Sequence, residues 1–210
     1  SGDPRDVEAA AQALCRARYP VIHAGQGALY AGASEELVEL AELLQVPVMT
    51  TLLGKSGFPE THPLALGSGS GVMSGPVYHY MGRSDVIFGI GCSFTKHGMC
   101  MNIPPGKTLI QATNDPGDIN KDYNIDYPIV GDAKLVLRQM IDACRDIVGD
   151  SRQSDETVAT EIKSEREAWL GQWVTKLTST STPINPYRVI WDLMQAIRPE
   201  DAIVTHDSGS

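Results

Sequence analysis

The chain has 210 residues, 42% of them hydrophobic, with a formal net charge of −9 and a pI near 4.9. This acidic balance argues against non-specific binding to nucleic acid or to an anionic membrane. Its apolar runs fall well short of the roughly 20 residues of a membrane span, and no signal peptide is recognisable. With four irregularly spaced cysteines, we expect a globular, cytoplasmic protein.

The first fifty residues predict one βαβ unit. Asp3 and Pro4 form a helix start, and the run Pro20-Val-Ile-His-Ala24 follows that helix. The run is short and apolar on both sides, which predicts an inner strand of a parallel sheet. Gly25 and Gly27 allow a sharp turn at its carboxyl end. A helix over about 35–44 and a strand over 46–50 complete the unit.

The same alternation continues to about residue 149. Further strands are predicted over 64–66, 85–91, 107–112 and 127–130, with helices over 72–81 and 132–148. The expected fold is therefore α/β, a six-stranded parallel sheet of the NAD/FAD-binding, Rossmann-like type over 1–149. A helical linker over 150–183 precedes a second α/β unit over 184–210, with a helix from Asn185-Pro186 and a strand over 202–205. A helix and one strand cannot bury a core, so we expect a fragment cut inside a further domain.

Candidate ligand positions gather where strands end. Gly25, Gly27 and Gly91 follow strands, and Gly71 and Gly75 open the helix over 72–81, where free N–H groups and the helix dipole attract anions. Asp115 follows the strand over 107–112. Its carboxylate could bond a ribose hydroxyl or simply initiate the turn before Pro116.

Three further motifs favour ordinary structural roles. Gly54-Lys-Ser-Gly57 lacks the spacing of a P-loop and is better interpreted as a solvated loop. Cys92, His97 and Cys100 do not complete a standard zinc pattern, so no metal site is predicted. His206, Asp207 and Ser208 are adjacent on an extended segment and would point in alternating directions, which disfavours a catalytic triad.

Several stretches, taken in order, resemble the middle domain of thiamine-diphosphate-dependent enzymes of the acetolactate synthase group, continuing into the start of their diphosphate-binding domain. Each stretch alone is a weak signal, but the ordered set covers nearly the whole chain. The stretches are Pro20–Gly27, Val46–Thr51, Gly54–Gly57, Phe58–Pro63, Ser84–Gly91, Gly131–Lys134 and Ala202–Gly209.

The resemblance implies a full-length enzyme of three α/β domains that decarboxylates or joins 2-oxo acids with thiamine diphosphate and Mg²⁺. Its partners would be the N- and C-terminal domains missing from this chain, within a homo-oligomer. Gly209 and Ser210 correspond to the start of the diphosphate-binding domain, with His206 and Asp207 nearby. The activating glutamate and the magnesium motif of the family lie in the other domains. We therefore expect no catalytic residue here and no activity from the fragment alone.

In some relatives the middle domain holds FAD or another adenine nucleotide, and the resemblance raises that question here. The Phe-Asp-Asp-Arg run of FAD-binding synthases is replaced by Phe94-Thr-Lys-His97, and Gln111–Asp115 retains a single acid. We therefore predict no tight FAD binding, with a weak adenine-nucleotide site left open. In the opposing interpretation the glycines only permit turns, and the crevice is empty or filled by Tyr78, Phe94 and Met99.

Two other functional classes remain as alternatives. One is a stand-alone nucleotide- or FAD-binding module without thiamine chemistry. It is weakened because Tyr30 stands where a dinucleotide fingerprint has its third glycine. The other is a purely structural domain whose surface serves oligomer contacts.

Overall fold

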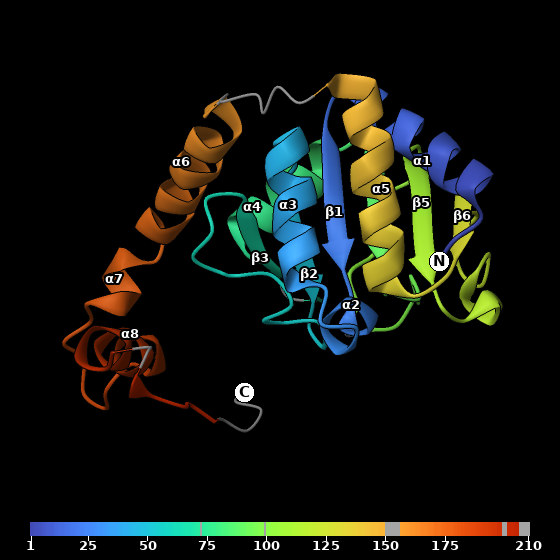
Figure 1. Ribbon diagram of the computed structural model, residues 1–210. Coiled ribbons are helices and arrows are strands. Elements are labelled where there is room, and N and C mark those ends of the chain that lie inside the picture. The colour runs from blue at the N-terminus through green and yellow to red at the C-terminus, as the bar shows by residue number, and fades with distance from the viewer. Residues whose placement is uncertain (72, 99, 150–155, 199–200, 206–210) are drawn as a thin grey trace. The chain divides into compact units, whose positions relative to one another are not determined.

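Six parallel strands form the central sheet, in the order β3-β2-β1-β4-β5-β6 (Figure 1). The computed structural model describes residues 1–71, 73–98, 100–149, 156–198 and 201–205. The strands are β1 (Pro20–Ala24), β2 (Val48–Thr51), β3 (Ala65–Gly69), β4 (Val86–Ile90), β5 (Thr108–Thr113) and β6 (Tyr127–Val130). This order reverses direction between β1 and β4, which is the switch point of a doubly wound sheet. The predicted six-stranded parallel fold is confirmed.

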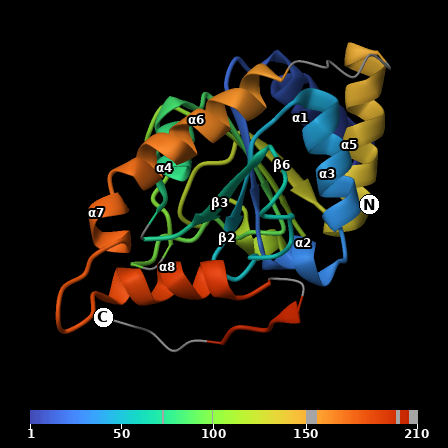
Figure 2. The same ribbon diagram turned by 90° about the vertical axis from the view of Figure 1, so that its left-hand side faces the viewer.

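Helices cover both faces of this sheet. One face carries α1 (Pro4–Arg16), α3 (Ser34–Leu44) and α5 (Ala133–Val148), while α4 (Gly75–Arg83) lies on the opposite side (Figure 2). Asp3 caps α1 and Asp132 caps α5, each through a side-chain oxygen that accepts a backbone N–H two or three residues later. A short helix, α2 (Gln26–Tyr30), follows β1 directly, where the sequence pattern predicts only a turn.

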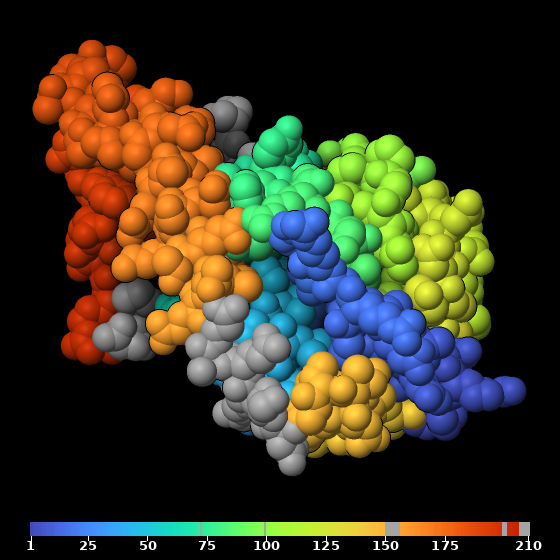
Figure 3. Space-filling view, turned by 90° about the horizontal axis from the view of Figure 1, so that it is seen from above, coloured from blue at the N-terminus to red at the C-terminus, as the bar shows by residue number. Residues whose placement is uncertain are grey.

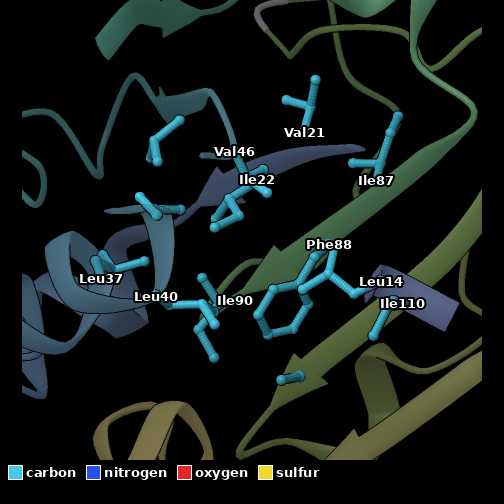
Figure 4. Packing of buried hydrophobic residues seen from close by; sticks show 14 of the residues in the cluster. Leu14, Val21, Ile22, Leu37, Leu40, Val46, Ile87, Phe88, Ile90 and Ile110 are labelled. Atoms are coloured by element: carbon cyan, nitrogen blue, oxygen red, sulfur yellow. The ribbon is translucent and has the colours of Figure 1, made fainter. Parts of the chain in front are cut away.

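The core explains why the strands are apolar on both sides. In the sheet register Val21 pairs with Ile87, and Ile22 pairs with Phe88. Figure 4 shows the first pair pointing to one face and the second pair to the other, where Leu37 and Leu40 of α3 approach. All six side chains are almost fully buried. Burial of each contributes roughly 1.5–3 kcal/mol, so this two-sided core holds the sheet and both helical layers together.

Glu36 lies in the first turn of α3 and is buried. Its side chain is 1% exposed and forms ion pairs with Lys134, at 3.5 Å, and with Arg138. Both cations belong to α5, so the carboxylate joins α3 to α5 across the helical layer. The helix-start pattern could not reveal this, because the partners lie about one hundred residues away in the sequence.

The first unit of the chain extends through residue 166. It includes the beginning of α6 (Thr157–Gly171), which lies beside α4 (Figure 3). Arg83 of α4 forms an ion pair with Glu161, the Arg166 guanidinium donates to the Ala65 carbonyl at 2.6 Å, and Ile162 is buried. The domain boundaries near 149 and 183 stay predictions.

Residues 167–210 form a separate unit. It contains the end of α6, α7 (Val174–Leu177) and α8 (Pro186–Ala196). Trp173 stacks on Tyr187 with 5.5 Å between ring centroids and packs edge-on against Trp169. Apolar side chains recur at helical spacing along α8, but no residue of that helix is buried.

Three expectations about elements need correction. Residues 202–205 form no strand in the structure, although a strand is predicted there; no neighbouring strand among the described residues offers a ladder to pair with. The sequence predicts one continuous helix over 158–177, but α6 ends at Gly171 and α7 follows separately. β3 runs through Gly69 rather than ending at Leu66, because residues 67–69 pair with β2.

None of the helices in the described parts of the chain is long and apolar enough to cross a membrane.

Candidate functional site

A pocket of about 740 Å³ opens where the strands of the first unit end. The carboxyl ends of β1 and β5 point to the side of the sheet where α2 lies (Figure 1). The pocket is lined by the β1–α2 turn, by the segments that follow β4 and β5, and by the start of α5. Ligands of open α/β sheets bind outside these ends, at the switch point in strand order. This pocket is therefore the candidate site.

Three of the predicted site glycines, Gly25, Gly27 and Gly91, line this pocket. They also pack backbone against backbone at the switch point. A Cβ on Gly91 would lie 2.2 Å from the Ala28 nitrogen, and a Cβ on Gly25 would lie 2.2 Å from the Gly91 carbonyl oxygen. Gly91 additionally has a φ of +61°. These glycines are required by the close approach of the two strand ends.

The N–H groups of the same glycines do not face a ligand. Gly25 donates to Ile90, Gly27 to Gly91 and Gly91 to Ala112, all at 2.8–2.9 Å to carbonyl oxygens. Each of these N–H groups is already used inside the fold, which favours the interpretation that the glycines permit tight turns over the alternative that their N–H groups hold a diphosphate. The three residues shape the pocket wall rather than offer donors to it.

The buried end of the pocket carries His23, which the sequence motifs do not single out. Its side chain is 6% exposed, and neither ring nitrogen has a hydrogen-bond partner among the described residues. Burial lowers the pKa of His23 to about 4. The imidazole is therefore neutral at physiological pH, and neither of its ring nitrogens is accessible to solvent. The feature of the sequence that could have identified His23 is a polar residue within an otherwise apolar strand.

Gly89 makes room for the groups that pack beside His23. It pairs with His23 across β1 and β4, and a Cβ there would lie 2.3 Å from the Phe94 ring. Phe94 adopts a φ of +48°, and its ring centroid lies 6.0 Å from that of His23. Burial raises the pKa of the Cys92 thiol to about 12, so Cys92 is neutral as well.

The charged side chains that line the pocket are mainly acidic. Asp118 and Asp132 contribute carboxylates, while the described lining residues include no lysine or arginine. The Asp118 carboxylate lies 3.7 Å from the Lys121 ammonium, and Asp132 accepts the Leu135 N–H at 3.0 Å as the α5 cap. The anion position at the start of α5 is thus taken by a carboxylate of the chain itself.

The other predicted site residues lie elsewhere. Gly71 and Gly75 do not line the pocket, although Gly75 does begin α4. Asp115 is exposed and accepts the Gly117 N–H at 2.8 Å, which is the turn-forming alternative. Gly209 and Ser210 lie outside the described residues, as do His206, Asp207 and Ser208.

The remaining motifs divide between the pocket and the surface. Cys92, His97 and Cys100 all line the pocket, but the described residues contain no group of three or more His, Cys, Asp or Glu placed to hold a metal. Lys55 of the Gly54–Gly57 loop forms an ion pair with Glu60. Of the residues expected to fill the crevice, Phe94 lines it, Tyr78 is exposed and outside the lining, and Met99 is not described.

FAD fits this pocket poorly for reasons of charge and donors. Its diphosphate needs cations or free N–H groups. The described lining carries two carboxylates instead, and the glycine N–H groups at the strand ends are used in the fold. The volume of about 740 Å³ lies within the usual range for ligand sites. The pocket is therefore roomy enough for a ligand but lacks the means to hold a diphosphate.

Comparison with known proteins identifies the class. Residues 7–140 match the family model described as "Thiamine pyrophosphate enzyme, central domain". The chain therefore belongs to the thiamine pyrophosphate enzyme family, of which it carries the central domain. The expected resemblance to the acetolactate synthase group is confirmed by the following relatives.

Two curated relatives match over essentially the whole chain. A protein described as "Probable acetolactate synthase large subunit" of Methanococcus aeolicus is 34% identical, covering 99% of this chain and 36% of the relative. The acetolactate synthase isozyme 3 large subunit of Escherichia coli is 33% identical, and the match covers 100% of this chain and 36% of the relative. The chain thus spans about a third of the length of these relatives.

A solved structure agrees with this assignment. Benzoylformate decarboxylase from Polynucleobacter necessarius superimposes with a TM-score of 0.61 at 26% identity, over 75% of this chain and 29% of that one. The comparisons do not favour a stand-alone nucleotide- or FAD-binding module, because the matches are to parts of larger thiamine enzymes.

Proposed function

We propose that the protein carrying this chain is a thiamine-diphosphate- and Mg²⁺-dependent enzyme that decarboxylates a 2-oxo acid or joins it to a second carbonyl compound. The observation that carries the proposal is the match of residues 7–140 to the central domain of the family, together with similarity to acetolactate synthase large subunits over the whole chain. Bound thiamine diphosphate supplies the carbanion-stabilising chemistry in such an enzyme.

In this proposal the first unit of the chain is a scaffold rather than a source of catalytic groups. The buried glycine contacts at the switch point and the ion pairs of Glu36 give it a rigid frame. The residues that the resemblance places nearest to thiamine diphosphate, His206 to Ser210, lie outside the described residues. No catalytic step is therefore assigned to a described side chain.

The wider setting is proposed on the same basis. The other domains of the enzyme would supply the activating glutamate and the magnesium ligands, and subunits would associate as a homo-oligomer. We also propose a cytoplasmic location, in keeping with the four cysteines, all of which are free thiols in the structure.

The test is an assay of the full-length protein with pyruvate, thiamine diphosphate and Mg²⁺, following CO₂ release and the carbonyl product. We expect turnover that is lost when thiamine diphosphate is removed and restored when it is added back. The 210-residue chain, assayed in parallel under the same conditions, is expected to give none. Turnover that does not depend on thiamine diphosphate, or turnover by the 210-residue chain, would contradict the proposal.

A further inference from the structure

We propose that Cys15 and Cys144 form a redox pair, which hydrogen peroxide converts into a disulfide that ties α1 to α5. Neither residue lines the switch-point pocket. The proposal therefore concerns a modification site of the first unit, and it does not depend on the thiamine chemistry of the whole protein.

The two cysteines lie at matching places on neighbouring helices. Cys15 is the last residue but one of α1, and Cys144 lies near the end of α5. Because α1 leads into β1 and α5 follows β6, both helices end near the amino ends of the strands. α1 and α5 pack against each other (Figure 3). The pair is thus at the end of the sheet away from the pocket.

This packing brings the two thiols together. Cys144 is fully buried, and Cys15 is half-buried against the same core. The two side chains share a hydrogen bond, so their sulfur atoms are direct neighbours. Packed helices have axes about 8–10 Å apart, with Cα atoms about 2.3 Å from each axis. Facing Cα atoms can therefore approach to the roughly 4.4–6.8 Å that a disulfide spans.

The two thiols differ as an attacking and a resolving cysteine differ. The hydrogen bond from Cys144 lowers the pKa of the Cys15 thiol, although burial opposes this effect. The same hydrogen bond, together with burial, raises the pKa of the Cys144 thiol. The thiolate is the reactive form of cysteine, and Cys15 is the more exposed of the two. Cys15 is therefore the attacking group and Cys144 the resolving group.

The oxidation takes two steps. First, the Cys15 thiolate attacks one oxygen of hydrogen peroxide and the O–O bond breaks, which leaves a sulfenic acid on Cys15. The other oxygen leaves as hydroxide and takes up the proton that the Cys15 thiol had lost. Second, the Cys144 sulfur attacks the Cys15 sulfur, the S–O bond breaks, and the departing hydroxyl leaves as water with the Cys144 proton. The two sulfurs together lose two electrons, which reduce one peroxide to two waters.

The other two cysteines provide a comparison within the same chain. Cys92 is buried, its thiol donates to the His23 carbonyl at 3.6 Å, and burial raises its pKa to about 12. Cys100 is exposed. Because Cys92 stays protonated and shielded, the bond expected on oxidation joins Cys15 to Cys144 rather than Cys92 to Cys100. In a reducing compartment such a bond is a transient modification, which thiol reductants reverse by exchange.

Peptide mapping of the oxidised full chain tests the proposal, because trypsin separates the four cysteines. Cleavage after lysine and arginine places Cys15 in residues 6–16, Cys92 in 84–96, Cys100 in 97–107 and Cys144 in 139–145. The folded wild-type chain would be treated with hydrogen peroxide, blocked with iodoacetamide and digested. We expect the peptides of Cys15 and Cys144 to be joined, with the loss of two hydrogen atoms, and to separate with dithiothreitol. This pairing should be roughly tenfold more abundant than any other, because oxidation follows thiolate character and access.

Two variants separate the roles of the pair. In Cys144→Ala, the oxidation of Cys15 should stop at the sulfenic acid, which dimedone traps. In Cys15→Ser, the buried Cys144 should stay reduced and should react with iodoacetamide only after unfolding. The matched control Cys100→Ala should form the wild-type disulfide.

The wild-type map decides the matter even where a variant fails to fold. Unlinked Cys15 and Cys144 peptides in a sample whose Cys100 is oxidised would overturn the proposal. So would a bond that joins Cys92 to Cys100 in preference to the proposed pair. A chain unfolded in urea before the peroxide treatment should lose the selectivity, and equal selectivity in the folded and unfolded chains would show that the packing of α1 against α5 is not its cause.

Discussion

Gly91→Ala is expected to destabilise the first unit by roughly 2–5 kcal/mol, a large part of the 5–15 kcal/mol that stabilises a typical domain. A left-handed φ costs alanine about 1–2 kcal/mol, and Gly91 has a φ of +61°. The new Cβ would also lie 2.2 Å from the Ala28 nitrogen, which is backbone and cannot move aside without shifting α2. Forcing atoms into a packed interior adds roughly 1–3 kcal/mol.

Two other glycines separate these contributions in urea unfolding experiments. Gly106 has a φ of +83°, and no atom lies within 4 Å of the position that a Cβ would occupy. Gly106→Ala should therefore be destabilised only by the cost of placing alanine at a left-handed φ. Gly82 lies exposed in α4 with open space around it, and Gly82→Ala should stabilise by up to about 1 kcal/mol. If Gly91→Ala were no less stable than Gly106→Ala, the close packing of the strand ends would be refuted.

Acidification is expected to weaken the fold through His23. The histidine has an ordinary pKa of 6.5 and a pKa of about 4 when buried in the folded chain. Between these values the unfolded chain binds a proton that the folded chain does not, so the free energy of unfolding falls as the pH falls. Relative to its value above pH 6.5, the free energy of unfolding is expected to be lower by about 2 kcal/mol at pH 5 and by about 3 kcal/mol below pH 4.

The difference between wild type and His23→Phe isolates this effect from other titrating groups. Urea unfolding gives the free energy of unfolding at pH 7.5 and at pH 5. The decrease in this free energy between the two pH values should be about 2 kcal/mol smaller in His23→Phe than in wild type. Gly82→Ala, which changes no ionisable group, should retain the wild-type drop. Equal drops in wild type and His23→Phe would show that His23 is not buried in a neutral state.

The fold was predictable because its signals are local. Val21 and Ile22 are apolar toward both faces, which indicates a strand covered on both sides, and the observed register confirms this. Asp3 and Asp132 mark the helix starts, and both are observed as N-caps. The strand predicted over 202–205 is absent for the opposite reason, because a strand needs a neighbour and the local pattern cannot supply one.

The candidate site was predictable in position but not in chemistry. Glycines after strands indicate the edge of the sheet where the pocket opens, and Gly25, Gly27 and Gly91 line that pocket. Whether an N–H is free depends on long-range bonds such as that from Gly91 to Ala112. The burial of His23 likewise depends on Phe94, which packs in the space left by Gly89. Neither feature is visible in a single stretch of sequence.

The flavin dependence of the full-length protein tests most directly whether the central domain can hold a diphosphate. The protein would be purified without added flavin, its absorbance near 450 nm recorded, and its thiamine-diphosphate-dependent turnover of pyruvate measured with and without FAD. We predict a colourless protein whose turnover FAD does not change, because the described pocket lining lacks groups that hold a diphosphate. Stoichiometric flavin in the purified protein, or turnover that requires FAD, would contradict this prediction.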